Sequence, residues 1–105
     1  MERPNMSYID ELSGGNVSFK NTLINIVKKE LPEEILVYKS NISAMHFKEA
    51  AENVHKLKHK ISILGLETSY KLAIQYEENL KVDSTALQVE FEAILDEMTR
   101  YVNTL

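Results

Sequence analysis

One short stretch of this chain gathers side chains that can do chemistry in water. His55, Lys58 and His59 lie close together within residues 55–65, which read HKLKHKISILG. An imidazole is largely neutral near pH 7, and it can then attack phosphorus without a separate general base. A lysine three residues further along a helix would offset the roughly two negative charges that a phosphoryl group carries. These residues favour phosphoryl transfer through His55, with Lys58 as the cation that neutralises the charge.

Helical periodicity predicts that the ring of His55 faces solvent. Apolar side chains recur every three or four residues from about residue 46 to residue 64 and mark the buried stripe of a helix. At ~100° per residue, His55 lies roughly 140° from the centre of that stripe. We expect Ala51, one turn back, to keep the approach to the ring open. The same spacing places a group of neighbours on the outward surface around His55: Lys48, Ala51, Glu52, Lys58, His59 and Ser62.

The rest of the chain shows similar apolar periodicity and contains few glycines or prolines. Gly14-Gly15 should end a first short helix, Gly65 should be the left-handed cap of a later one, and Asp83 or Ser84 should cap the start of the last. Pro32 predicts either one kinked helix or two abutting helices. The expected helices cover about 7–12, 18–42, 46–64, 67–80 and a last segment that reaches Val102.

Four substantial helices joined by short loops favour a particular all-α fold. We predict an antiparallel up-and-down four-helix bundle with a short additional N-terminal helix. The 105 residues fit a single domain, residues 1–105, because two cores would each be too small to be stable.

Composition excludes several classes of protein. The chain has no cysteine, so disulfides and thiolate zinc sites are ruled out. Its apolar runs fall short of the roughly 20 residues that cross a bilayer, and no secretory signal is visible at the N-terminus. The net charge is −4, and the lysines are interleaved with acids except around residues 56–60, which argues against nucleic acid as a partner. We expect a cytoplasmic monomer that binds neither membranes nor nucleic acid.

The segment around His55 resembles the histidine-containing phosphotransfer family. That family shows His-x-Leu-Lys-Gly and then a Leu-Gly pair further along the same helix. Here His55, Leu57 and Lys58 match the start, and Leu64-Gly65 match the pair. Tyr76-Glu77 stands where the family usually has Leu-Glu on the next helix. The N-terminal half is similar in style, so the resemblance spans nearly the whole chain.

The resemblance implies a four-helix bundle with an exposed phospho-accepting histidine. By this resemblance His55 is the acceptor, Lys58 is its positive neighbour and Gly65 is structural. The usual partners are receiver domains of response regulators or hybrid kinases in two-component phosphorelays. The chain would be a phosphocarrier and not an enzyme with its own ATP site. It would need no cofactor of its own, and Mg²⁺ is expected in the partner receiver domain, which would supply most of the catalysis.

One position departs from the family pattern. The family commonly has Gly directly after the Lys, whereas this chain has His59. His59 could crowd the site, hydrogen-bond the phosphoryl group, tune the choice of partner or accept phosphate itself. The register of the motif selects His55 as the acceptor.

Two other functions compete with phosphotransfer. His55 and His59 form an i, i+4 pair, and Glu52 and His55 form a Glu-x-x-His spacing, both of which occur in metal sites. We nevertheless predict no metal site, because no further ligand is well placed. The second alternative is a non-phosphorylated helical adaptor that docks receiver domains without accepting phosphate.

Several residues that could do chemistry receive structural interpretations. Glu77 is expected to make a hydrogen bond between helices. The tyrosines on apolar stripes should be core or boundary residues, and Met45 and Met98 should fill gaps in the core. The tyrosines concerned are Tyr38, Tyr70, Tyr76 and Tyr101.

Overall fold

The computed structural model describes residues 2–105, and this range is helical without strands, which confirms the predicted all-α class. A short first helix is followed by a long second one and by three helices of similar length. None of the helices in this range is both long enough and apolar enough to cross a bilayer. The five helices are α1 (Ser7–Ser13), α2 (Val17–Ser43), α3 (Phe47–Ile63), α4 (Glu67–Lys81) and α5 (Gln88–Val102).

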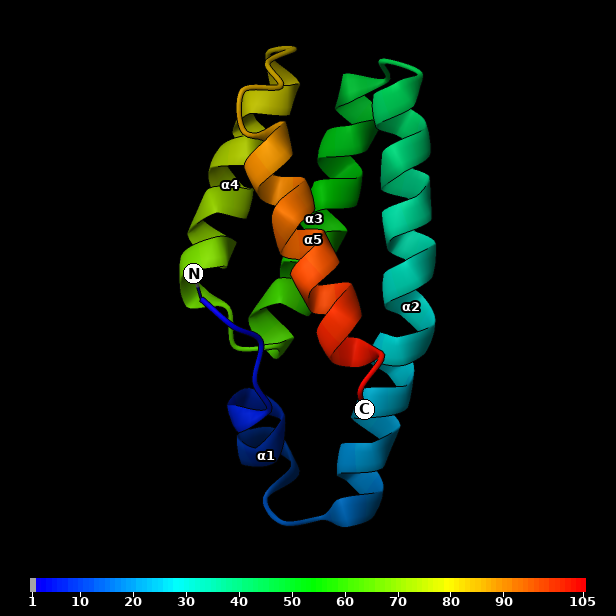
Figure 1. The fold of residues 1–105 in the computed structure, drawn as a ribbon, viewed down its shortest axis with the longest axis vertical. Coiled ribbons are helices and arrows are strands. Elements are labelled where there is room, and N and C mark those ends of the chain that lie inside the picture. The colour runs from blue at the N-terminus through cyan, green and yellow to red at the C-terminus, as the bar shows by residue number, and fades with distance from the viewer. Residues whose placement is uncertain (1) are drawn as a thin grey trace.

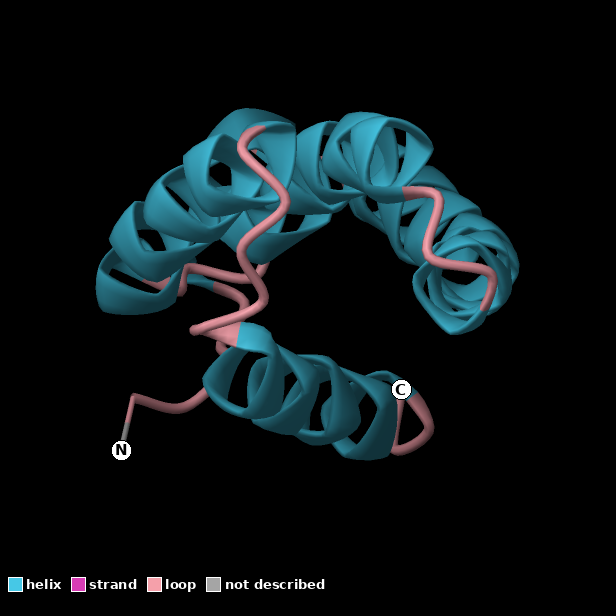
Figure 2. Cartoon of the chain, turned by 90° about the horizontal axis from the view of Figure 1, so that it is seen from above, coloured by secondary structure: helices cyan, strands magenta, loops and turns pink. Residues whose placement is uncertain are grey.

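The four long helices run along the long axis of the molecule, and successive helices point in opposite directions (Figure 1). α2 packs on α3 and α3 packs on α4, while α5 contacts both α4 and α2. Seen from above, α2, α3 and α4 form a curved row, and α5 lies across its open side (Figure 2). The outer surface of α3 and α4 is therefore left uncovered by the rest of the chain.

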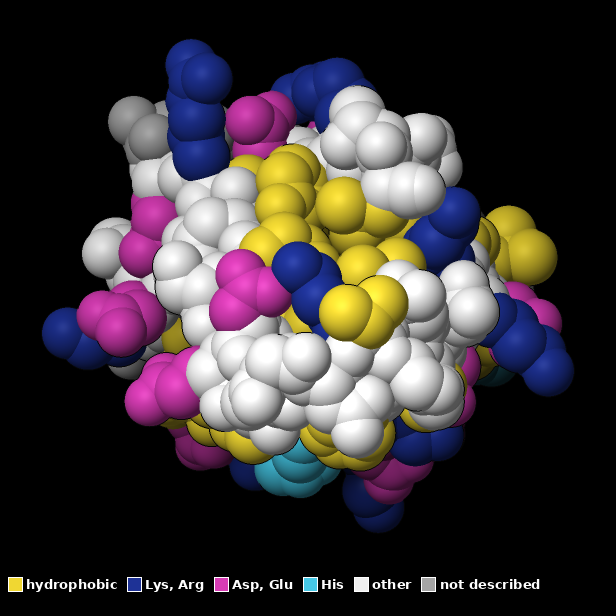
Figure 3. Space-filling view, turned by 90° about the horizontal axis from the view of Figure 1, so that it is seen from below, with side chains coloured by type: hydrophobic (Ala, Val, Ile, Leu, Met, Phe, Trp, Pro, Cys, Tyr) yellow, Lys and Arg dark blue, Asp and Glu magenta, His cyan; other side chains and the backbone are white. Residues whose placement is uncertain are grey.

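The lower end of the molecule is formed by α1 and the start of α2 (Figure 1). α1 contacts α2, and its Ile9 is fully buried. Leu12 and Phe19 are about half exposed. Viewed from below, apolar side chains are open to solvent in the middle of this end, with charged side chains around them (Figure 3). α1 thus covers only part of the apolar surface here.

The core is built from the apolar stripes of the long helices and contains two buried tyrosines. The hydroxyls of Tyr38 and Tyr76 are 2.7 Å apart, and that of Tyr38 donates to Glu92 over 3.0 Å. Tyr70 and Tyr101 pack at the edge of the core, so the interpretation of all four tyrosines is confirmed. Met98 is buried as expected. Met45 is 71 % exposed, so its predicted role as a core filler is wrong.

α2 is one helix of 27 residues that continues through Pro32. The alternative of two abutting helices is therefore wrong. Pro32 lies on the exposed side of the helix. Val27 and Tyr38, on either side of it, are buried in the same core, so both halves of α2 pack against that core. A buried lysine on α3, Lys60, also ties α3 to α2 through ion pairs of 2.9 Å with Glu30 and 3.2 Å with Glu34.

Three helices end with the same hydrogen-bonded turn, in which a residue with positive φ follows the cap. At the end of α3 this residue is Gly65, with φ of 76°, as predicted. Its N–H donates to Ser62 and that of Leu66 donates to Ile61. Met45 and Asp83 take the equivalent places after α2 and α4, each with φ of 60°. The prediction that Asp83 or Ser84 caps the last helix is wrong, because Asp83 instead closes α4, and α5 begins only at Gln88.

The N-terminal segment is tied to the turn between α3 and α4. The backbone N–H of Asn5 donates to Leu64, and the carboxylate of Glu2 accepts from the N–H groups of Thr68 and Ser69. Glu2 therefore satisfies free amide groups at the start of α4. This contact fixes the turn that positions α3 against α4.

Replacing Gly65 with alanine is expected to lower the free energy of unfolding by about 1–2 kcal/mol. A Cβ at this position would lie 2.6 Å from Asn5 Oδ1, and the positive φ adds strain. Met45→Gly is the matched change at the equivalent turn after α2, where it should raise the free energy of unfolding by about 0.5 kcal/mol, since glycine relieves the strain. Urea unfolding followed by circular dichroism measures both. Equal stability of the two variants would contradict this account of the turns.

Candidate functional site

His55 lies in the middle of α3, and 59 % of its side chain is exposed. The residues that flank the buried side of the helix at this level, Val54 and Leu57, are fully buried. Core packing of that stripe fixes the rotation of α3 about its axis, and this rotation turns the imidazole outward. The prediction that the ring faces solvent is confirmed.

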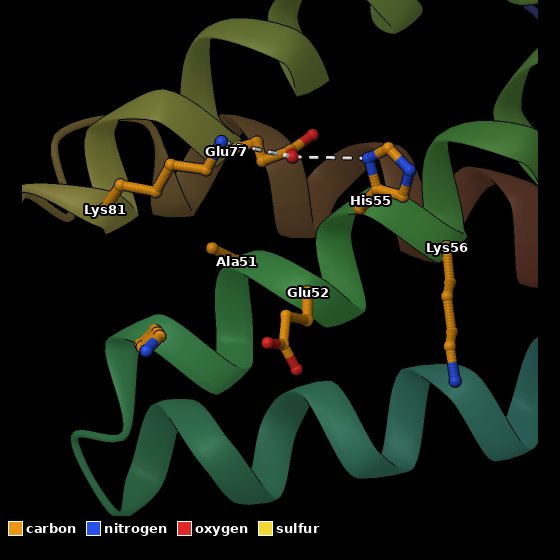
Figure 4. A pocket seen from close by; sticks show the side chains of 7 residues that line it. Ala51, Glu52, His55, Lys56, Glu77 and Lys81 are labelled. Atoms are coloured by element: carbon orange, nitrogen blue, oxygen red, sulfur yellow. Dashed lines mark hydrogen bonds and ion pairs between the residues drawn. The ribbon is translucent and has the colours of Figure 1, made fainter.

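His55 forms part of the wall of a groove between α3 and α4 (Figure 4). The groove has a volume of about 580 Å³ and is open to solvent on the outer surface of the molecule. Three lysines line the groove, so its walls carry positive charge although the protein as a whole is acidic. Its walls are Lys48, Ala51, Glu52, His55 and Lys56 from α3, and Glu77 and Lys81 from α4.

Glu77 is the hub of the polar contacts beside His55. Its Oε2 lies 3.3 Å from Nδ1 of His55, and its Oε1 lies 2.8 Å from Nζ of Lys58. Nζ of Lys81 is 3.7 Å from the same Oε2. Only 10 % of the Glu77 side chain is exposed, so these contacts bridge α3 and α4 at the edge of the core. The expectation that Glu77 makes a hydrogen bond between helices is confirmed.

The charge of Glu77 decides which nitrogen of His55 carries hydrogen. Burial raises the pKa of Glu77, but the ion pair with Lys58 and the charges of His55 and Lys81 outweigh it, so the pKa of Glu77 is lowered overall. The side chain is therefore a carboxylate at neutral pH and can only accept. It follows that Nδ1 of His55 donates the hydrogen. In the neutral ring, Nε2 then keeps its lone pair and is free to act as a nucleophile.

Lys58 is placed differently from the sequence expectation. Only 13 % of its side chain is exposed, because it leaves the outward surface and turns toward α4. There its Nζ pairs with Oε1 of Glu77 and lies 5.9 Å from the centre of the Tyr70 ring. Within residues 2–105, Oε1 accepts no well-aligned hydrogen bond, so the ammonium group is what offsets the burial of that oxygen. The prediction that Lys58 stands on the outward surface is wrong.

The other predicted neighbours divide into two groups. Lys48 and Glu52 are exposed and line the groove, as expected. Ala51 also lines it but is 3 % exposed, so its predicted place on the exposed surface is wrong; the helix α4 packs over that side of α3. Ser62 is exposed but belongs to a separate depression. The ring of His59 is exposed and makes an edge-to-face contact with His55, with centroids 5.5 Å apart.

The ligand set of the metal alternative is incomplete in the part of the chain that the structure describes. Between residues 2 and 105, no three histidine, aspartate or glutamate side chains are grouped so as to hold an ion. The pair of His55 and His59 supplies two ligands at most. A protein metal site of this type needs three or four.

Comparisons of the chain with protein-family models, with curated proteins and with solved structures find no match. The groove and the motif around His55 are therefore the features of the chain that bear on its function.

Sequence reasoning missed two residues of the groove, Lys56 and Lys81. Lys81 lies four residues after Glu77 on α4, a spacing that brings two side chains together on one helix face. That spacing was visible in the sequence. What was not visible is that α4 packs with this face beside His55.

Proposed function

We propose that this protein is a histidine phosphotransfer module of a two-component phosphorelay. It takes a phosphoryl group onto His55 from an aspartate of one receiver domain and passes it to an aspartate of another. One observation carries the proposal: an exposed imidazole has its Nδ1 held by a buried carboxylate, while its Nε2 points away from that carboxylate (Figure 4). The motif around His55 supports the same function.

The geometry suits a direct displacement at phosphorus. The lone pair of Nε2 attacks the phosphorus of an aspartyl phosphate, a nitrogen–phosphorus bond forms, and the bond to the aspartate oxygen breaks, so that the aspartate leaves as a carboxylate. The hydrogen on Nδ1 stays in place, and the positive charge that develops on the ring is stabilised by Glu77, 3.3 Å away. The return step is the reverse. The partner receiver domain supplies the Mg²⁺ and most of the catalysis, so the chain is a phosphocarrier and not an enzyme with its own ATP site.

The proposal includes the finer architecture and setting. We take α2 to α5 as an antiparallel up-and-down four-helix bundle with α1 added at the N-terminus, and residues 1–105 as one domain. Such a bundle presents a rigid, convex face to a partner, which phosphoryl transfer needs because it depends mostly on positioning. The protein would work in the cytoplasm as a monomer, with receiver domains of response regulators or hybrid kinases as partners and without nucleic acid or membrane.

The decisive experiment mixes the protein with phosphorylated receiver domains. We expect a phosphoryl group that is labile in acid and stable in base, as phosphohistidine is, and mass spectrometry should map it to position 55. Phosphorylation at another residue, or failure to accept phosphate from a panel of receivers and from a small phosphodonor, would refute the proposal.

A non-phosphorylated adaptor is the second candidate, and one contact favours it. His59 lies against the ring of His55 at the position where phosphotransfer proteins commonly have glycine, so it narrows the space around the acceptor. An adaptor would bind receiver domains with equal affinity before and after His55→Gln and would carry no phosphoryl group. Binding measurements alongside the transfer assay separate the two functions.

A further inference from the structure

Two exposed imidazoles lie next to each other on the outer face of α3. His55 and His59 are four residues apart, a spacing that places two side chains one above the other on a helix. Their rings meet edge to face, with centroids 5.5 Å apart. Phosphotransfer through His55 uses one of these rings and gives the other no role.

The distance between the rings fits a pair that shares one metal ion. Zinc binds imidazole nitrogens at about 2.1 Å in a tetrahedral arrangement, which sets the centroids of two such rings about 5 Å apart. Two histidines at i and i+4 on one helix face form a chelating pair. Nε2 of His55 points away from Glu77, in the direction in which α3 continues (Figure 4). Because both rings are exposed, a small rotation of the His59 side chain can bring one of its nitrogens and Nε2 of His55 onto a common ion.

Glu77 makes the outer contact that is typical of a metal-binding histidine. A histidine that binds a metal through one ring nitrogen usually donates the N–H of the other to a carboxylate, which fixes the tautomer and makes the ligand more basic. Nδ1 of His55 lies 3.3 Å from Oε2 of Glu77, and this carboxylate is mostly buried. The lone pair of Nε2 is therefore available in the form that a metal ion binds.

The lysines nearest to the two rings are held toward the neighbouring helices. Lys58 is paired with Glu77 on α4, and Lys60 is paired with two glutamates of α2. Lys56 also points toward α2 (Figure 4). These positions lower the repulsion that a cation would meet at the rings, since the interaction between charges falls with distance.

We propose that His55 and His59 together bind an exchangeable divalent transition metal ion such as Zn²⁺, and that the bound ion blocks phosphorylation of His55. The ion takes the lone pair of Nε2, which is the pair that would attack phosphorus, so the metal and the phosphoryl group exclude one another. Two protein ligands are fewer than a resident metal centre has, and water completes the shell. The ion is thus a reversible inhibitor and not a cofactor. The metal site does not depend on the proposed function, whereas the inhibition rests on it.

Calorimetric titration of the whole protein with Zn²⁺, in a buffer that does not chelate metals, tests the site. We expect one ion per chain. Because losing an outer partner of a ligand already costs about 10–100-fold in affinity, losing a ligand in His59→Gln or His55→Gln should weaken binding about 100-fold or more. His46→Gln is the matched control, since it removes an exposed histidine at the N-cap of the same helix. Its affinity for Zn²⁺ should be unchanged.

Two further measurements locate the ion without an assay of phosphorylation. In nitrogen NMR, Zn²⁺ should shift the Nε2 resonance of His55, while Nδ1 keeps its hydrogen. The two rings are held together only when α3 is folded, so Zn²⁺ should raise the Tm of the unmodified protein and of His46→Gln. The Tm of His59→Gln should not rise.

Phosphoramidate measures the effect of the ion on phosphorylation without a receiver domain. In this reaction the phosphorus–nitrogen bond of the donor breaks, ammonia leaves with the electron pair, and a bond from phosphorus to Nε2 forms. At a Zn²⁺ concentration about ten times the measured Kd, the rate should fall about ten-fold, because about one chain in ten stays free. A chelator should restore the rate. His59→Gln should react at its full rate at the same Zn²⁺ concentration.

The outcomes separate this inference from the proposed function. If the unmodified protein does not bind Zn²⁺, or if His59→Gln binds it equally well, the inference is wrong and the proposed function is unaffected. If Zn²⁺ binds but phosphorylation keeps its full rate, the ion does not occupy Nε2 and the inference is again wrong. If Zn²⁺ binds as expected and neither phosphoramidate nor any receiver phosphorylates His55, the metal site stands, and the proposed function fails together with the inhibition.

Discussion

His55→Gln is expected to abolish phosphoryl acceptance while leaving the fold intact. Glutamine offers an amide in place of the imidazole and has no nucleophilic nitrogen, so no stable phosphorylated product can form at this position. The ring is largely exposed, and surface substitutions of this kind change the free energy of unfolding by no more than about 0.5 kcal/mol. Transfer from a labelled receiver domain measures the first effect, and thermal unfolding measures the second.

His59→Gln is the control for this experiment. It makes the same substitution one helical turn away, on a ring that touches His55. The variant should still take up label at position 55. Full labelling of His55→Gln together with loss of labelling in His59→Gln would move the acceptor to His59 and overturn the assignment.

Glu77→Gln is expected to slow phosphoryl transfer about ten-fold or more, the usual effect of losing the carboxylate that orients a histidine. The amide no longer forces the hydrogen onto Nδ1, so part of the population would place it on Nε2, the attacking nitrogen. It also leaves Lys58 mostly buried without a counter-charge, which should cost about 1–3 kcal/mol of stability. Nitrogen NMR of His55 reports the tautomer, and rapid-quench transfer from a receiver reports the rate.

Glu78→Gln, the same change on an exposed neighbour in α4, should alter neither the tautomer nor the stability. The pH dependence gives a second check on Glu77. Because its folded pKa lies below the ordinary value of 4.5, its stabilising contribution is fully present above that value and is lost as the pH falls through the folded pKa. The stability gap between Glu77→Gln and the unmodified protein should therefore close in acid. If the difference in stability between the two proteins persists at low pH, the ion pair between Glu77 and Lys58 is not its cause.

The sequence was sufficient to place His55 at the surface, because the apolar stripe of α3 fixes which way each Cα–Cβ bond points. It could not place the ammonium group of Lys58, since a flexible four-carbon side chain follows the nearest carboxylate, and that carboxylate belongs to α4. Ala51 was misplaced for a related reason: it lies at the edge of the stripe, where packing of the next helix decides burial. The apolar periodicity of a single helix does not reveal such contacts with another helix.

The turns that follow the helices also show what sequence alone can and cannot predict. Gly65 was predictable, because glycine adopts positive φ at little cost. Met45 adopts the same conformation against its own preference, and Asp83, a residue type that tolerates it better, also adopts it, each at φ of 60°. For these two residues, the surrounding helices and the turn hydrogen bonds outweigh the local strain. The expected ends of α2 and α4, at residues 42 and 80, lie within one residue of those observed, but local residue preference could not predict the left-handed conformation that follows each of them.

The positions of the two chain ends have a practical consequence. Glu2 binds the start of α4 next to α5 residues, and the carbonyl of Leu105 accepts from Lys28 on α2. Glu2 and Leu105 lie on the side of α5, whereas the groove opens on the outer surface of α3 and α4. A fluorescent reporter or a tether to a sensor chip, attached at either end, would project away from the imidazole. Immobilised protein should thus keep the same access to a visiting partner as protein free in solution.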